Sequence, residues 1–87
     1  MKANLSPQQQ LAEQYKERGN ELFKAGNLPA AIWEFDEGLK NDPSNKFLYS
    51  NRALAYIRLM QPVKALSDAD MALKLDPLFV KAWARKG

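Results

Sequence analysis

Apolar and small residues recur at spacings of three or four along most of the chain, which is the period of an amphipathic helix. Five such stripes follow one another: Leu11, Tyr15, Gly19 and Leu22; Leu28, Ala31, Ile32, Phe35 and Leu39; Leu48, Tyr49, Ala53 and Tyr56; Ala65, Leu66, Ala69, Ala72 and Leu73; Val80, Trp83, Ala84 and Gly87. The pattern predicts an all-α protein with five helices.

Capping and breaking residues set the expected ends of these helices. Ser6 is a capping residue, Pro7 suits the first helical position, and Gln9 completes a capping box. The breaks between helices fall at Gly26-Asn27, Asp42-Pro43-Ser44-Asn45, Gln61-Pro62 and Asp76-Pro77. We therefore expect the third helix over about residues 45–59 and the fifth from near residue 78.

The stripes repeat with a fixed period of 34 positions. Tyr15, Tyr49 and Trp83 are spaced by this amount, and the same offset links Ala31 to Ala65 and Pro43 to Pro77. A constant period of this length indicates stacked units, each made of two helices. The sequence predicts one domain over residues 1–87, with one repeat at about 12–45, a second at about 46–79, and a truncated third at about 80–87.

The composition argues against an enzyme. The chain contains no cysteine and no histidine, so it lacks a thiolate nucleophile, the usual general base and the commonest metal ligand. It also lacks a glycine-rich phosphate loop and any cluster with metal-ligand spacing. We expect no catalysis, no cofactor and no bound metal.

No apolar run approaches the ~20 residues of a membrane span, and the N-terminus is polar where a signal peptide needs an apolar core. The expected location is cytoplasmic, with no membrane partner.

The net charge is only +3, but it is unevenly distributed along the chain. Residues 44–60 and residues 78–87 each contain three basic and no acidic side chains. Residues 27–42 contain four acidic side chains and one basic side chain. If the basic segments share a surface, that surface should attract anions.

The repeating residues resemble the tetratricopeptide repeat (TPR) family. The matched positions are Tyr15, Gly19, Leu22, Ala31, Phe35 and Pro43 in the first repeat, and Tyr49, Ala53, Tyr56, Ala65, Ala72 and Pro77 in the second. Gly38 and Ala69 depart from the usual pattern, which has an alanine and an aromatic residue there. The resemblance implies a right-handed superhelix of helix-turn-helix repeats, with the first helix of each repeat lining a concave groove.

Five polar residues on these first helices resemble the dicarboxylate clamp of co-chaperone TPR domains, namely Lys16, Asn20, Asn51, Lys81 and Arg85. The surrounding segments KERGNELF, YSNRA and KAWARKG are also similar to the Hop or stress-inducible co-chaperones. The resemblance implies a partner: the C-terminal Glu-Glu-Val-Asp tail of the 70- or 90-kilodalton heat-shock chaperones. Lysine and arginine can form charge-assisted hydrogen bonds to its carboxylates, and asparagine can donate without adding charge.

Four more residues fall on the same helix faces and are weaker candidates for contacts upstream of the last aspartate. They are Phe23, Leu54, Ile57 and Arg58. Phe23 and Ile57 fit a place in the core equally well.

Two other functions remain open. One is a generic TPR scaffold for a different peptide. The other is an RNA-binding helical repeat, which a basic groove with aromatic residues would suit. The small net charge and the acidic second helix argue against RNA, so no nucleic-acid partner is expected.

The C-terminal end predicts exposed apolar surface. Each TPR unit buries its apolar face on the next, and no sixth helix follows to cover the fifth. Phe79, Val80 and Trp83 should then be partly bare. The sequence predicts a marginally stable monomer, or self-association through the truncated fifth helix.

Overall fold

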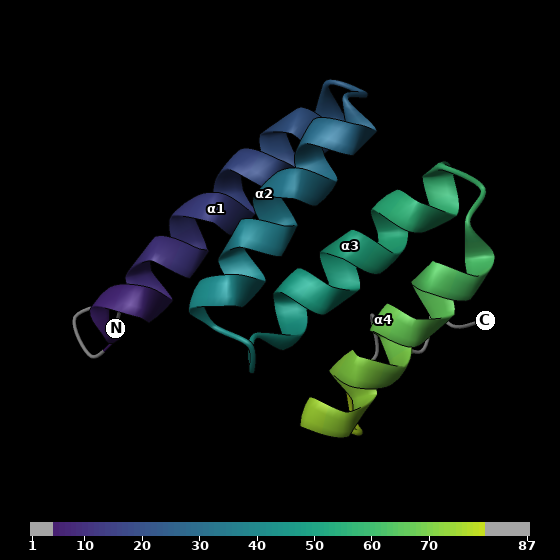
Figure 1. The fold of residues 1–87 in the computed structure, drawn as a ribbon. Helices are drawn as coiled ribbons and strands as arrows, with labels where there is room; N and C mark the ends of the chain where they lie inside the picture. Colours follow the sequence, from purple (N-terminus) through teal and green to yellow (C-terminus); the bar gives the residue numbers. More distant parts are fainter. Residues whose placement is uncertain (1–4, 80–87) are drawn as a thin grey trace.

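The computed structural model describes residues 5–79, which form four helices. They are α1 (Pro7–Lys24), α2 (Leu28–Asn41), α3 (Lys46–Arg58) and α4 (Pro62–Leu75). Helix α1 packs against α2, α3 packs against α4, and α2 joins the two pairs by packing against α3 (Figure 1). The predicted all-α fold is confirmed, whereas the expected fifth helix lies outside the described residues.

The predicted start of α1 is confirmed in detail. The backbone N–H of Gln9 donates to Ser6 Oγ at 3.1 Å, and the N–H of Ser6 donates to Gln9 Oε1 at 2.9 Å. This reciprocal pair is a capping box, and it satisfies two donors that a helix N-terminus would otherwise leave unpaired. Asn27 and Asn45 cap α2 and α3 in the same sense, through their side-chain oxygens.

The two helix pairs turn in the same way after their first helix. Gly26 follows α1 with a φ of 84°, and Met60 follows α3 with a φ of 61°. In each case the next residue closes the turn, since the N–H of Asn27 donates to Leu22 O and the N–H of Gln61 donates to Tyr56 O, both at 2.9 Å. Glycine adopts this left-handed conformation freely, whereas methionine does so at a cost. The repeat therefore preserves the turn but not the residue type.

Glycines lie where helices approach closely. A Cβ added at Gly19 would lie 2.4 Å from the ring of Phe35, which is itself buried. A Cβ at Gly38 would lie 2.9 Å from a methyl group of Leu48, so glycine at this departure from the family pattern allows α2 and α3 to pack closely. The core gathers around these contacts, and its buried apolar residues are Ala12, Ala31, Phe35, Leu39 and Leu48.

The expectation that Phe79 would be partly bare is wrong. Phe79 is only 8% exposed, and its ring packs edge-to-face on Phe47 with 5.3 Å between centroids. The chain turns immediately after α4, because Asp76 accepts two hydrogen bonds there. Its side-chain Oδ1 accepts from the N–H of Leu78, and its main-chain carbonyl accepts from the N–H of Phe79. Leu66 also differs from the predicted stripe, since it is 42% exposed. Val80 and Trp83 lie outside the described residues.

Candidate functional site

The centre of the candidate site is a hydrogen bond between two asparagines on different helices. Asn51 Nδ2 on α3 donates to Asn20 Oδ1 on α1 at 3.0 Å, and both side chains are partly buried. An amide side chain has two donor hydrogens and one carbonyl acceptor. The bond uses one donor of Asn51 and the acceptor of Asn20, so amide hydrogens remain on both residues that can donate to an anion.

Lys16 lies one helical turn before Asn20. Its ammonium is 2.9 Å from Glu13 Oε2 and 5.3 Å from the centroid of the Phe47 ring. The lysine side chain is 20% exposed, so the aromatic ring and the neighbouring helix cover much of its stem. The charge is therefore held against Glu13 and Phe47 rather than extended into solvent.

Phe23 and Arg58 make a further contact between α1 and α3, toward the C-terminal ends of the two helices. The guanidinium of Arg58 lies 5.1 Å from the centroid of the Phe23 ring. Phe23 also packs against the core, which confirms the core role considered for it from the sequence, while a contact with a peptide stays a prediction. Leu54 is half-buried on α3, and Ile57 is 37% exposed.

These contacts form three successive steps between α1 and α3: Lys16 with Phe47, Asn20 with Asn51, and Phe23 with Arg58. We call these six residues the α1–α3 seam. Residues three, four or seven apart share a helix face, so all three steps lie along one line. Lys81 and Arg85, the other two predicted clamp residues, lie outside the described residues.

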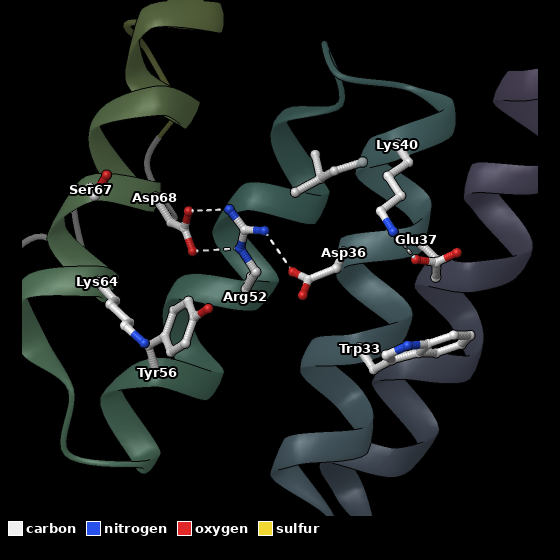
Figure 2. Close-up of a pocket in the computed structure, with 10 residues that line it drawn as sticks. Trp33, Asp36, Glu37, Lys40, Arg52, Tyr56, Lys64, Ser67 and Asp68 are labelled. Atoms are coloured by element: carbon white, nitrogen blue, oxygen red, sulfur yellow. Dashed lines mark hydrogen bonds and ion pairs between the residues drawn. The ribbon is translucent and has the colours of Figure 1, made fainter.

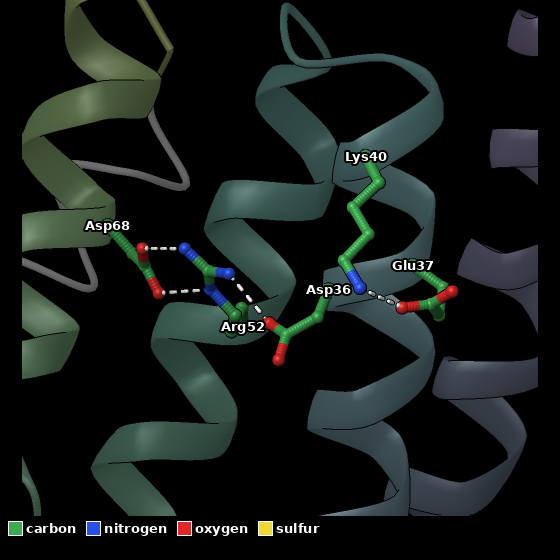
Figure 3. A network of polar contacts seen from close by, with 5 residues as sticks. All are labelled: Asp36, Glu37, Lys40, Arg52 and Asp68. Carbon is green, nitrogen blue, oxygen red and sulfur yellow. Dashed lines mark hydrogen bonds and ion pairs between the residues drawn. The ribbon is translucent and has the colours of Figure 1, made fainter.

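The basic residues of the segment 44–60 do not form one shared anion-binding surface. Arg52 donates through Nε and Nη2 to both carboxylate oxygens of Asp68, at 2.8 and 2.6 Å, and through Nη1 to Asp36 at 2.7 Å (Figure 3). Lys46 is bonded to Asp76 at 2.5 Å. Two of the three basic charges are thus neutralised by acidic partners on other parts of the fold.

Sequence reasoning missed this arginine network. Asp36 and Asp68 each lie 16 residues from Arg52, one on α2 and one on α4. Burial lowers the pKa of the Arg52 guanidinium, but the hydrogen bonds that it donates to Asp68 and Asp36 outweigh burial, so the pKa is raised above its ordinary value. The arginine therefore stays charged, and it joins α3 to both second helices.

The same network lines an open cleft of about 600 Å³ formed by α2, α3 and α4 (Figure 2). Most of its charged groups are paired with one another, because Lys40 is bonded to Glu37 at 2.7 Å in addition to the Arg52 contacts. Lys64 instead lies over the Tyr56 ring, with 5.6 Å between its ammonium and the ring centroid. The pKa of Lys40 is raised mainly by the hydrogen bond to Glu37. Since Arg52 and Lys40 are already paired with acidic side chains, this cleft is a weaker candidate for an anionic ligand than the seam.

The seam carries polar and aromatic groups that suit the binding of a small anionic ligand. Between residues 5 and 79, no three potential metal ligands are grouped closely enough to hold an ion. None of the described helices is long and apolar enough to cross a membrane. The seam offers amide donors, an ammonium group and aromatic faces, which together can hold a carboxylate with an apolar neighbour.

Comparison with known proteins adds to this geometry. No protein-family model matches the chain. The second TPR of Spaghetti (RPAP3) bound to the HSP90 peptide SRMEEVD is 37% identical, with a TM-score of 0.88, and covers 90% of this chain and 72% of that one. The chain belongs to the tetratricopeptide repeat family. The sequence-based resemblance is therefore confirmed, and the described helices are two TPR helix pairs.

Other TPR proteins are similar to a comparable extent. The TPR2B domain of yeast Sti1, solved as a complex with pHsp70, is 36% identical with a TM-score of 0.86, and covers 88% of this chain and 60% of that one. Stress-induced-phosphoprotein 1 of Caenorhabditis elegans is 44% identical over 74 residues, or 85% of this chain. The chain spans 23% of the length of that relative.

Proposed function

We propose that this TPR chain is a non-catalytic co-chaperone module that holds the C-terminal Glu-Glu-Val-Asp tail of 70- or 90-kilodalton heat-shock chaperones. The observation that carries the proposal is the Asn20–Asn51 bond, because it brings together the amides of two predicted clamp positions. Lys16 lies one turn away on the same line. The similar domains solved with an HSP90 peptide and with pHsp70 support the same ligand class.

The terminal aspartate of such a tail carries two carboxylates. In this proposal the main-chain carboxylate lies on Lys16, Asn20 and Asn51, where one ammonium and several amide hydrogens converge. Lys81 and Arg85 hold the other carboxylate. Each hydrogen bond to a charged group is worth ~1.5–3 kcal/mol, so several of them can hold a short peptide.

Residues upstream of the terminus then lie toward the Phe23–Arg58 end of the seam. Leu54 is half-buried and Ile57 is 37% exposed, so both can contact apolar groups of the ligand. Arg58 stacks on Phe23 and places a positive charge near the same region. This suits a tail with a valine next to its last aspartate and two glutamates before it.

The proposal is tested by calorimetric titration with a Glu-Glu-Val-Asp peptide and with the same peptide amidated at its C-terminus. Wild-type protein should bind the free acid and lose roughly tenfold or more in affinity for the amide. Alanine variants of Lys16, Asn20, Asn51, Lys81 and Arg85 should each weaken binding. Lys24→Ala is a matched control, because Lys24 is on α1 but its side chain is 74% exposed and pairs with Glu21. Unchanged affinity in both the Lys81 and Arg85 variants would disprove the clamp.

We also propose the division of the chain into repeats of about 12–45, 46–79 and a truncated 80–87, and a cytoplasmic location. The helix pairs α1–α2 and α3–α4 fall inside the first two repeat limits except for the first turn of α1, which supports the register. The cytoplasmic location fits a co-chaperone. Self-association through the C-terminal end is a further proposal, supported by the exposure of Leu78, which is 85% exposed.

A further inference from the structure

Phe47 is a partly exposed aromatic ring that is held from several sides. It lies in the first turn of α3, and 42% of it is exposed. The ammonium groups of Lys16 and Lys46 each lie 5.3 Å from its centroid, and Phe79 packs edge-to-face against it. Lys46 is itself bonded to Asp76. A ring restrained in this way cannot easily swing aside when a ligand approaches.

The position of Phe47 on the seam gives it a specific relation to the ligand. It precedes Asn51 by one helical turn, so the three steps run in the order Phe23–Arg58, Asn20–Asn51, Lys16–Phe47. The proposed peptide has its upstream residues at the first step and its terminal carboxylate at the second, where the ammonium of Lys16 also reaches it from the third. Any atoms beyond the terminus would therefore meet the third step.

A hollow of about 410 Å³ lies on the far side of this step. It is lined by Leu5, Gln9, Glu13, Asp42, Ser44, Asn45, Lys46, Phe47 and Leu75. Phe47 is thus both a member of the seam and a wall of the hollow. The ring stands between the place of the terminal carboxylate and space that is large enough for an additional residue.

We propose that Phe47 is a specificity-determining residue that closes the end of the peptide groove and excludes ligands that continue past the terminal aspartate. This inference rests on the proposed function, since it takes the position of the terminal carboxylate from it. It adds a steric reason for C-terminal recognition to the electrostatic one. The clamp attracts the free carboxylate, and the ring blocks a chain that continues.

The test compares a Glu-Glu-Val-Asp peptide with the same peptide extended by one C-terminal glycine, both ending in a free carboxylate. Affinities are measured by calorimetry for wild type, Phe47→Ala, Phe47→Val and Phe47→Tyr. The readout is the ratio of the two Kd values, so a general loss of affinity in a variant cancels. Phe47→Val keeps part of the packing on Phe79 in case the alanine variant folds poorly. Trp33→Ala is a control, because Trp33 is an exposed aromatic on α2 and lies away from the seam.

Wild type, Phe47→Tyr and Trp33→Ala should bind the extended peptide roughly tenfold more weakly than the tail peptide. In Phe47→Ala and Phe47→Val, the ratio of the Kd for the extended peptide to the Kd for the tail peptide should fall about fivefold, because the added glycine can then enter the hollow. The role proposed for Phe47 is wrong if wild type binds both peptides equally, or if the ratio of the two Kd values is unchanged in both Phe47→Ala and Phe47→Val. Neither result would contradict the clamp. Failure of wild type to bind the unextended tail overturns the proposed function itself.

Discussion

Asn51 and Arg52 are adjacent on α3, yet their side chains join different parts of the fold. Asn51 reaches Asn20 on α1, while Arg52 reaches Asp36 on α2 and Asp68 on α4. Successive residues on a helix point about 100° apart, so one turn of α3 can serve two faces. The first residue belongs to the candidate ligand site, and the second connects the helix pairs.

Replacing Arg52 should therefore affect stability, and replacing Asn51 should affect binding. Asp68 is only 4% exposed, so Arg52→Ala leaves a buried carboxylate without its main partner. Breaking such a pair costs ~3 kcal/mol, whereas Asn51→Ala loses one neutral hydrogen bond, worth ~1 kcal/mol. Urea unfolding measures both values, with Lys24→Ala as an exposed ion-pair control. Equal stability of the Arg52 and Lys24 variants would contradict the network.

The turn after α3 should be stabilised by glycine. Met60 is 85% exposed, so it has little packing to lose, and its φ of 61° is unfavourable for a side chain with a Cβ. Met60→Gly should raise the free energy of unfolding by about 0.5–1 kcal/mol. The reciprocal control is Gly26→Ala, which should lower it, because a Cβ at Gly26 meets no atom within 4 Å and the cost is backbone strain alone. A lower melting temperature for Met60→Gly together with a higher one for Gly26→Ala would rule out backbone strain as the cause.

Stability should fall in acid partly through Asp76. The hydrogen bond from Lys46, and then that from the N–H of Leu78, lower the pKa of Asp76 from its ordinary value of 3.8. The unfolded chain binds the proton more tightly, so this contribution is complete above the ordinary pKa and is lost as pH falls through the lowered one. The Tm difference between wild type and Asp76→Asn should shrink below about pH 4. A Tm difference between the two proteins that stays constant from pH 6 to pH 2 would exclude a contribution of Asp76 to acid sensitivity.

Glu13 should compete with the ligand for Lys16. Its carboxylate lies 2.9 Å from the lysine ammonium, so a bound peptide has to share or displace it. Glu13→Gln should raise affinity for the Glu-Glu-Val-Asp peptide by up to about threefold, and the gain should diminish in high salt. Glu21→Gln is the matched control on the same helix, since Glu21 pairs with exposed Lys24 instead. An identical gain in both variants would indicate a long-range charge effect rather than competition.

The C-terminal end should support self-association. The exposed apolar residues on and after α4 include Val63, Leu66, Leu75 and Leu78. Sedimentation velocity should show an average mass that rises with protein concentration, because such side chains favour burial against a second copy. Leu78→Glu should suppress the increase. A wild-type protein that stays monomeric at every concentration, with a high melting temperature, would argue against this proposal.

Several features of the fold could be predicted from the sequence because they depend on residues only a few positions apart. The capping box of Ser6 and Gln9 spans three residues, and the left-handed turn at Gly26 needs only the glycine itself. The period of 34 extends this local information to the whole chain, since it indicates that the same helix pair is built twice. The resemblance to the dicarboxylate clamp singled out Asn20 and Asn51, and the structure joins them by a hydrogen bond.

Tertiary structure alone decided which charged and aromatic groups meet. The sequence places Arg52 in a basic segment, but the structure bonds it to acidic residues 16 positions away on both sides. Lys46 is likewise bonded to Asp76, which lies 30 residues away. Phe47 occupies no matched position of the repeat, and its place in the seam follows from its contacts with Lys16 and Phe79. Such pairs leave no periodic signal, because a long side chain can choose among several neighbouring helices. The choice follows from helix packing and from the cost of leaving a buried charge unpaired.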